Sequence, residues 1–316
     1  MKGVVLNYND IDDSHTCSYG VTDHTNGSIQ SVGMISKKDH SNEDIGREVV
    51  RDSLQVLLEK DSDSFTIYNN SRYHPQLEIS RFPHNIREQI YDNIDLTVES
   101  DASGTPSHSA EFIANAATQF ISNNYARFDD PVSTNKAPGP QNKETEVRDS
   151  NSNYKYKYTE PSPETYYLYA DASYHPNENT SSISYVIIGQ NGGLFGRGKS
   201  VTPQTITRAE FLALLSGISV IQKNRPRCKI ISYTDSRDVK RALNNSLMID
   251  KGLNNTAESL TNNSAYDVEV RCIDRNSNSL ADALAKVSRT RDTISIGRLN
   301  PENNTTNVTK HNMSVA

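Results

Sequence analysis

The chain has 316 residues, of which 34% are hydrophobic and none is Trp, and its formal net charge is −6 at pH 7. This length accommodates two domains of ordinary size. The negative balance excludes a general basic coat, so nucleic acid would have to be held by local positive patches or by metal ions. The sequence contains no apolar run near the roughly 18 residues of a spanning helix, no signal-peptide core and only three isolated cysteines, which excludes a membrane span, a disulfide framework and a zinc knuckle. We therefore expect a soluble, cytoplasmic protein with no membrane partner.

Residues 1–121 alternate short apolar stretches of strand type with longer stretches of helix type. The patterns predict strands at 3–8, 18–23, 29–35, 65–68 and 95–99, and helices at 42–60 and 109–121. This alternation predicts an α/β domain in the N-terminal half.

Two segments lack apolar periodicity. Residues 122–164 carry Pro, Gly, Asn, Ser and mixed charges, a composition typical of a solvated linker. Residues 291–316 are rich in Asn and Thr, and we expect them to form a disordered tail. The boundary between the two domains is therefore predicted within 122–164.

Residues 165–290 contain the most regular apolar stretches of the chain. They predict strands at 165–170, 182–190, 194–200, 229–234 and 268–273, and helices at 207–223, 236–243 and 279–287. A Gly-rich turn at 191–193 joins the second and third strands as a hairpin. The order βββαβαβα predicts a sheet flanked by helices.

Four acids fall at the ends or on the faces of these predicted elements: Asp171, Glu210, Asp235 and Asp282. Acids that follow apolar strands lie at the edge of a sheet, where side chains can converge in a crevice. Each acid taken alone is also explained as a helix cap or a strand end, because Asp is a common N-cap residue. Their local sequences decide between these interpretations.

The local sequences around the four acids resemble the type 1 ribonuclease H family, in the order in which the family has them. They are YADAS at 169–173, TRAEFLALLSGI at 207–218, YTDSRDVKRAL at 233–243 and IDRNSNSLADALA at 273–285. The last is the most specific, because Arg275, Asn278 and Asp282 stand in the family pattern R-x-x-N-x-x-A-D-x-L-A. The resemblance implies an α/β fold for residues 165–290, with a mixed five-stranded sheet and flanking helices.

The resemblance also implies the chemistry of the site. Asp171 would bridge two Mg²⁺ or Mn²⁺ ions, with Glu210 and Asp235 on one ion and Asp282 on the other, since hard oxygen ligands suit these metals. Four residues would contact the substrate: Thr205, Thr207, Arg275 and Asn278. Thr207 departs from the Asn that the family usually has there.

The implied function is that of an endoribonuclease that hydrolyses the RNA strand of RNA/DNA hybrids, which makes the hybrid the expected partner. Two alternatives remain open. One is a DNA nuclease or junction resolvase with the same fold, since fold alone does not fix function. The other is a nucleic-acid-binding module without catalysis. We expect the fragment from Tyr158 to Thr290 to fold and cleave alone, because it contains every matched motif.

Residues 1–121 are predicted to be a degenerate second copy of the same fold. Glu48 parallels Glu210, and Glu111 lies roughly where the second copy has Asp282. Asn70, however, replaces the third acid, and an amide lacks the charge that helps hold hard cations. This copy should therefore be catalytically silent. The alternative is an unrelated α/β domain.

Overall fold

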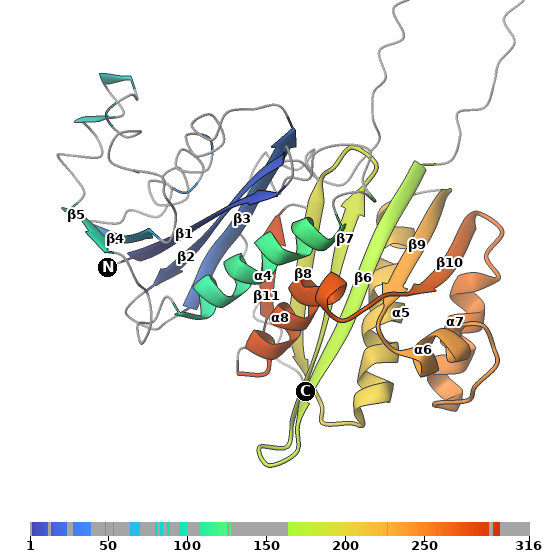
Figure 1. Cartoon of the computed structure of the whole chain (residues 1–316). Coiled ribbons are helices and arrows are strands. Elements are labelled where there is room, and N and C mark those ends of the chain that lie inside the picture. The colour runs from blue at the N-terminus through green and yellow to red at the C-terminus, as the bar shows by residue number, and fades with distance from the viewer. Residues whose placement is uncertain are drawn as a thin grey trace, which may run out of the picture.

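The computed structural model describes residues 164–225, 227–290 and 293–297, and in the N-terminal half residues 2–11, 14–23, 28–38, 64–69, 95–99 and 108–124 with a few single residues between and after them. Two sheets lie beside one another, with one helix between them (Figure 1). No helix within these described parts is long and apolar enough to cross a membrane.

The N-terminal sheet has five strands in the order β3-β2-β1-β4-β5. They are β1 (Lys2–Ile11), β2 (Ser14–Asp23), β3 (Ser28–Lys38), β4 (Ser64–Asn69) and β5 (Asp95–Glu99). β1 pairs antiparallel with β2 and parallel with β4, and β5 continues parallel to β4. All five were predicted as strands. The predicted helix at 42–60 falls largely outside the described residues.

The C-terminal sheet has the order β10-β9-β6-β7-β8-β11. Its strands are β6 (Glu164–His175), β7 (Thr180–Gly189), β8 (Leu194–Val201), β9 (Cys228–Thr234), β10 (Tyr266–Cys272) and β11 (Thr293–Gly297). Central β6 pairs antiparallel with β7 and parallel with β9. The first five strands therefore have the same order and directions as the N-terminal sheet. The predicted mixed α/β fold is confirmed.

The sixth strand, β11, differs from the sequence expectation, which placed residues 291–316 in a disordered tail. Thr293–Gly297 instead pairs antiparallel with β8 at the edge of the sheet. Ile294 and Ile296 are buried while the residues beside them face outward. This alternation is too short to stand out in an otherwise polar stretch, and residues 298–316 lie outside the described part.

Helices cover both faces of the C-terminal sheet. They are α5 (Ile206–Asn224), α6 (Arg237–Leu243), α7 (Lys251–Thr261) and α8 (Ser279–Ser288), with a short 3₁₀ turn, η2 (Asn276–Asn278), before α8. α5, α6 and α7 pack in one apolar cluster with Leu168 and Ala170 of β6, and α8 packs in a second cluster with Tyr169. Successive residues of β6 thus face opposite layers. α7 was not predicted, because only Asn254 and Ala257 of this helix are buried.

Helix α4 (His108–Asn124) belongs to both halves of the molecule. It packs on β2 of the N-terminal sheet, where a side chain at Gly20 would collide with Ala110. Its Ile113 and Phe120 are fully buried in the same cluster as Tyr169 and α8, and Figure 1 shows α4 between the N-terminal sheet and α8. Helix α4 therefore supplies part of the apolar core of the C-terminal half, and the predicted boundary after residue 121 falls close to the end of a core helix.

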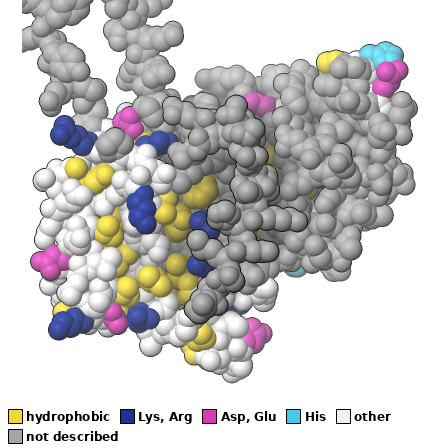
Figure 2. Space-filling model, turned by 180° about the vertical axis from the view of Figure 1, so that it is seen from behind, with side chains coloured by type: hydrophobic (Ala, Val, Ile, Leu, Met, Phe, Trp, Pro, Cys, Tyr) yellow, Lys and Arg dark blue, Asp and Glu magenta, His cyan; other side chains and the backbone are white. Residues whose placement is uncertain are grey.

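Charged side chains of both signs are scattered over the described surface. On the face in Figure 2, Lys and Arg side chains stand singly among apolar and uncharged ones over the C-terminal half. Lys229 lies 3.3 Å from Asp267 and 3.5 Å from Glu269, and Arg271 also pairs with Glu269 at 2.6 Å. These acids neutralise part of the positive charge, as the net charge of the sequence predicts.

Candidate active site

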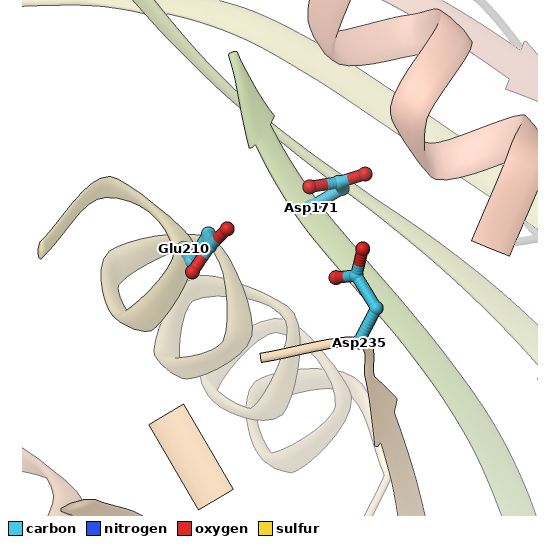
Figure 3. Close-up of side chains that lie close together, drawn as sticks. All are labelled: Asp171, Glu210 and Asp235. Atoms are coloured by element: carbon cyan, nitrogen blue, oxygen red, sulfur yellow. The ribbon is translucent and has the colours of Figure 1, made fainter. Parts of the chain in front are cut away.

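Three acids from different elements meet at one edge of the C-terminal sheet. Asp171 lies in β6, Asp235 directly follows the parallel neighbour β9, and Glu210 comes from the second turn of α5. One carboxylate oxygen of each lies within 4.8 Å of the others (Figure 3). The parallel pairing brings the first two together, because carboxyl ends of neighbouring parallel strands meet at the same edge.

Close packing of α5 brings Glu210 to the sheet. Gly217 faces Leu168 so closely that an added Cβ would lie 2.4 Å from a Leu168 methyl group. The absence of a side chain at Gly217 lets the helix approach β6, the strand that carries Asp171. Leu214 and Ile218 of the same helix are fully buried in the adjoining cluster.

The local structure argues against a purely capping role for two of the acids. Ser236, not Asp235, caps α6, since the Ser236 hydroxyl accepts a hydrogen bond from the Val239 N–H at 3.4 Å. Asp171 does not end its strand, because β6 continues to His175. Neither acid is therefore needed to end a strand or begin a helix.

Burial has the largest effect on the pKa of each of the three acids. Asp171 is 4% exposed, and burial together with the Asp235 charge raises its pKa well above the ordinary value. Burial also raises the pKa of Glu210 and of Asp235. Negative charge at this edge is therefore costly without a compensating cation.

The carboxylate oxygens have few hydrogen-bond donors among the described residues. Asp171 Oδ1 accepts from the Ala172 N–H at 2.7 Å, but buried Asp171 Oδ2 and Asp235 Oδ1 have no partner there. Buried oxygens of this kind need a proton or a cation. Because every donor is a hard carboxylate oxygen, the three acids fit a divalent ion such as Mg²⁺ or Mn²⁺.

Asp282, the fourth predicted acid, lies outside this group of three. Its carboxylate contacts Arg275 Nη2 at 3.2 Å and Lys286 Nζ at 2.5 Å. Its charge nevertheless raises the pKa of both Asp171 and Asp235, so it lies within electrostatic reach of them. Lys286 was not predicted as a neighbour of the site, although its position four residues after Asp282 on α8 indicates a contact.

The four predicted substrate contacts divide into accessible and buried residues. Thr205 is exposed at the N-cap of α5, Thr207 is half-buried in its first turn, and the Arg275 side chain is 70% exposed. Asn278 is fully buried, and its Nδ2 donates to the Ala170 carbonyl at 3.0 Å. This side chain fastens η2 to the residue before Asp171, and its predicted contact with the substrate stays a prediction.

The fold and the acidic cluster define an α/β domain with a candidate centre for divalent cations. Residues 169–288 match the family described as reverse transcriptase-like. The C-terminal half of the chain is a ribonuclease H-like domain, and the resemblance found in the sequence is confirmed. No curated protein sequence matches the chain significantly.

Solved structures similar to the chain include three of interest. The N-terminal RNase H domain of a Mycobacterium tuberculosis protein is 16% identical over 40% of this chain and 94% of the fusion-protein chain, with a TM-score of 0.37. An RNase H1 isolated from compost, solved in complex with an RNA/DNA hybrid, is 16% identical over 40% of this chain and 96% of its own, with a TM-score of 0.36. The protease-reverse transcriptase of Prototype Foamy Virus is 11% identical over 91% of this chain and 39% of its own, with a TM-score of 0.31.

Proposed function

We propose that this protein hydrolyses the RNA strand of RNA/DNA hybrids with two divalent metal ions, Mg²⁺ or Mn²⁺. The observation that carries the proposal is the meeting of Asp171, Glu210 and Asp235 within 4.8 Å in a ribonuclease H-like domain. Their partly unpartnered, buried oxygens are suited to hard cations.

Each side chain has a proposed role. Asp171, Glu210 and Asp235 would hold one ion, and Asp171 with Asp282 would hold the second. Bound ions supply positive charge at the attacking and leaving oxygens of a phosphodiester. The carboxylates must lose their protons before they bind a cation, so metal affinity should rise with pH. The accessible Arg275 guanidinium beside Asp282 is placed to contact a phosphate.

The substrate would be held by local contacts. A net charge of −6 and singly placed Lys and Arg side chains give little long-range attraction for a polyanion (Figure 2). Thr205 and Thr207, at the N-terminus of α5, are proposed to contact the backbone or base edges of the hybrid. With Cys228 and Cys272 both free, we propose that the protein works in the cytoplasm, where thiols stay reduced.

The test is cleavage by the full chain of an RNA/DNA hybrid, a DNA duplex and a four-way junction, in Mg²⁺, Mn²⁺ or a chelator. We expect metal-dependent cleavage of the hybrid RNA strand. Preferential cutting of DNA or junctions would instead support a DNA nuclease or resolvase, and binding without cleavage a non-catalytic module.

The residue test within this experiment is Asp235→Asn. We expect cleavage to fall by about 100-fold or more, the usual cost of losing a group that stabilises the transition state, while the fold persists. Asp250→Asn is the matched control, because Asp250 caps α7 by accepting from the Leu253 N–H at 3.0 Å and lies outside the cluster of three acids. Asn caps helices about as well as Asp, so this change should lower stability by less than about 1 kcal/mol and leave cleavage intact. Near-normal cleavage by Asp235→Asn would refute the proposed metal centre of carboxylates.

We also propose that residues 1–121 form a degenerate ribonuclease H-like copy without activity, joined to the C-terminal half by a linker between α4 and β6, since residues 122–124 of the expected linker lie in α4 and Glu164 lies in β6. The shared strand order of the two described sheets supports this interpretation. Asn70 lies outside the described residues, so its correspondence to Asp235 of the C-terminal copy stays a prediction. Asn70→Asp should not create a second metal centre. Metal titration of a protein that carries both Asn70→Asp and Asp235→Asn would test this.

A further inference from the structure

We infer that helix α4 of the N-terminal half is a positioning element of the C-terminal active site, and that its buried Asn124 fixes the turn η2 that leads from Arg275 to Asp282. The inference rests on the proposed metal-dependent cleavage. It assigns a role in that reaction to a helix outside the segment that matches the family.

Asn124 uses its side chain to connect three elements. Although it is only 1% exposed, its Nδ2 donates to the Ser277 carbonyl at 2.8 Å as well as to the Phe120 carbonyl of its own helix. Its Oδ1 accepts from the Tyr169 hydroxyl at 3.2 Å and from Arg127 at 2.8 Å. A buried amide with these partners has little freedom to move, so it ties η2 and β6 to α4.

Two more hydrogen bonds connect α4 to the same turn. Asn123 Nδ2 donates to the Asn276 carbonyl at 3.0 Å, and the Ser279 hydroxyl donates to the Ala116 carbonyl at 3.1 Å. α4 thus contacts the first two residues of η2 and the first residue of α8. Because η2 is a single turn with little regular hydrogen bonding, these contacts, together with the bond from Asn278 to the Ala170 carbonyl, help to fix where α8 begins and where Asp282 lies.

The contacts continue to the acids themselves. Tyr169, which binds Asn124, lies two residues before Asp171 and stacks on Tyr233, two residues before Asp235, with ring centroids 4.7 Å apart. Residues two apart along a strand point to the same side. Arg127 lies 5.1 Å from the centre of the Tyr233 ring. Asn124 at the end of α4 and Arg127 just after it therefore support β6 beside Asp171 and β9 just before Asp235.

The test compares Asn124→Leu with the control Thr118→Val in the full chain. Leu has the branched shape of Asn, with two methyl groups in place of the amide oxygen and nitrogen, but none of its hydrogen bonds. Thr118 is a buried residue of the same helix that faces the N-terminal half, where its hydroxyl pairs with Ser18 at 2.9 Å. Both variants lose buried polar contacts, and only Asn124→Leu releases η2.

The readouts are Mn²⁺ binding without substrate, thermal melting, and kcat and KM on the hybrid. We expect Asn124→Leu to weaken Mn²⁺ binding and lower kcat by about 10- to 100-fold, the usual cost of losing a group that orients metal ligands, with KM little changed. Thr118→Val should melt lower but bind Mn²⁺ normally. A folded Asn124→Leu with the Mn²⁺ affinity and kcat of Thr118→Val overturns the inference.

If Asn124→Leu does not fold, Asn123→Ala decides, because Asn123 is exposed and its loss removes only the bond to Asn276. A smaller shift in the same direction supports the inference, and wild-type Mn²⁺ affinity overturns it. Wild-type protein that binds Mn²⁺ without cleaving hybrids refutes the proposed activity alone, and the Mn²⁺ comparison still tests the role of α4. Wild-type protein that binds no Mn²⁺ refutes both.

Discussion

Asp171 couples the stability of the protein to pH. Burial and the neighbouring Asp235 raise its pKa in the folded state, so the metal-free native state favours the protonated form. The resulting stability is fully present below the unfolded pKa of about 3.9 and is lost as the pH rises through the raised pKa. Asp171→Asn, which imitates the neutral form, should therefore melt higher than wild type in chelator at pH 7, by about 2–4 °C for each kcal/mol.

Melting temperatures measured in chelator between pH 4 and pH 8 check this prediction. The advantage of Asp171→Asn should grow with pH and should reverse when Mg²⁺ or Mn²⁺ is added, because the ions stabilise only a protein that binds them. Asp250→Asn should change the melting temperature in the opposite direction, because the hydrogen bond from the Leu253 N–H lowers the pKa of Asp250 and so favours its charged form. A lower melting point of Asp171→Asn at pH 7 in chelator would contradict the cost assigned to the buried charge.

Among single residues, the sequence could predict those that lie in a recognisable local motif. Asp171, Glu210 and Asp235 follow recognisable local patterns, and the structure brings them together. Asn124 could not be predicted, because its partners Ser277 and Tyr169 are far away in the chain and a helix-terminal Asn is otherwise ordinary. The burial of Asn278 could not be predicted either, since burial depends on tertiary packing.

Among the elements, α4 offers a direct test of its contribution to the core of the C-terminal half. Phe120 is fully buried and packs edge-on against Tyr169, with ring centroids 4.7 Å apart, whereas Phe112 of the same helix is 39% exposed. Phe120→Ala should cost about 3–5 kcal/mol of unfolding free energy, and Phe112→Ala less than about 1 kcal/mol. Urea denaturation measures both values. Equal losses would show that α4 does not contribute to the core of the C-terminal half as described.

β11 is the second element with a testable contribution. A chain ending at residue 290 loses Ile294 and Ile296, which are 5% and 1% exposed, and leaves β8 as an unprotected edge. Burial of such a side chain contributes about 1.5–3 kcal/mol, and open edges promote aggregation. We expect this chain to melt lower and aggregate more than one ending at residue 300, by calorimetry and light scattering. Identical behaviour would make β11 dispensable.

The regular elements were predictable because their periodicity is a local property. The long apolar face of α5 and the strands of both sheets extend over enough residues to show it. α7 and β11 escaped prediction for opposite reasons. α7 buries only Asn254 and Ala257 and begins at the cap Asp250, so it has almost no apolar face. β11 has an apolar face but only five residues.

For the molecule as a whole, the contribution of α4 to this core predicts that the C-terminal half depends on the N-terminal half. The sequence alone led us to expect that residues 158–290 fold and cleave independently, because every matched motif lies there. The structure leads to the opposite expectation, since α4 supplies Ile113, Ala117, Phe120 and Ile121 to the core around Tyr169. Motif matching could not show this dependence, because it concerns contacts between segments distant in the chain.

We therefore predict that a fragment of residues 158–300, which keeps β11 but lacks α4, forms a loosely packed state. It should retain far-UV circular dichroism, lose near-UV signal and bind a hydrophobic dye, because the apolar side of β6 and α8 that α4 covers would face water. It should cleave hybrids poorly, since η2 also loses the Asn123 and Asn124 hydrogen bonds. The chain of residues 1–300 is the control and should melt in one cooperative transition that includes both halves. A 158–300 fragment that melts cooperatively and cleaves hybrids at the rate of this control would show that α4 is dispensable for both the core and the site.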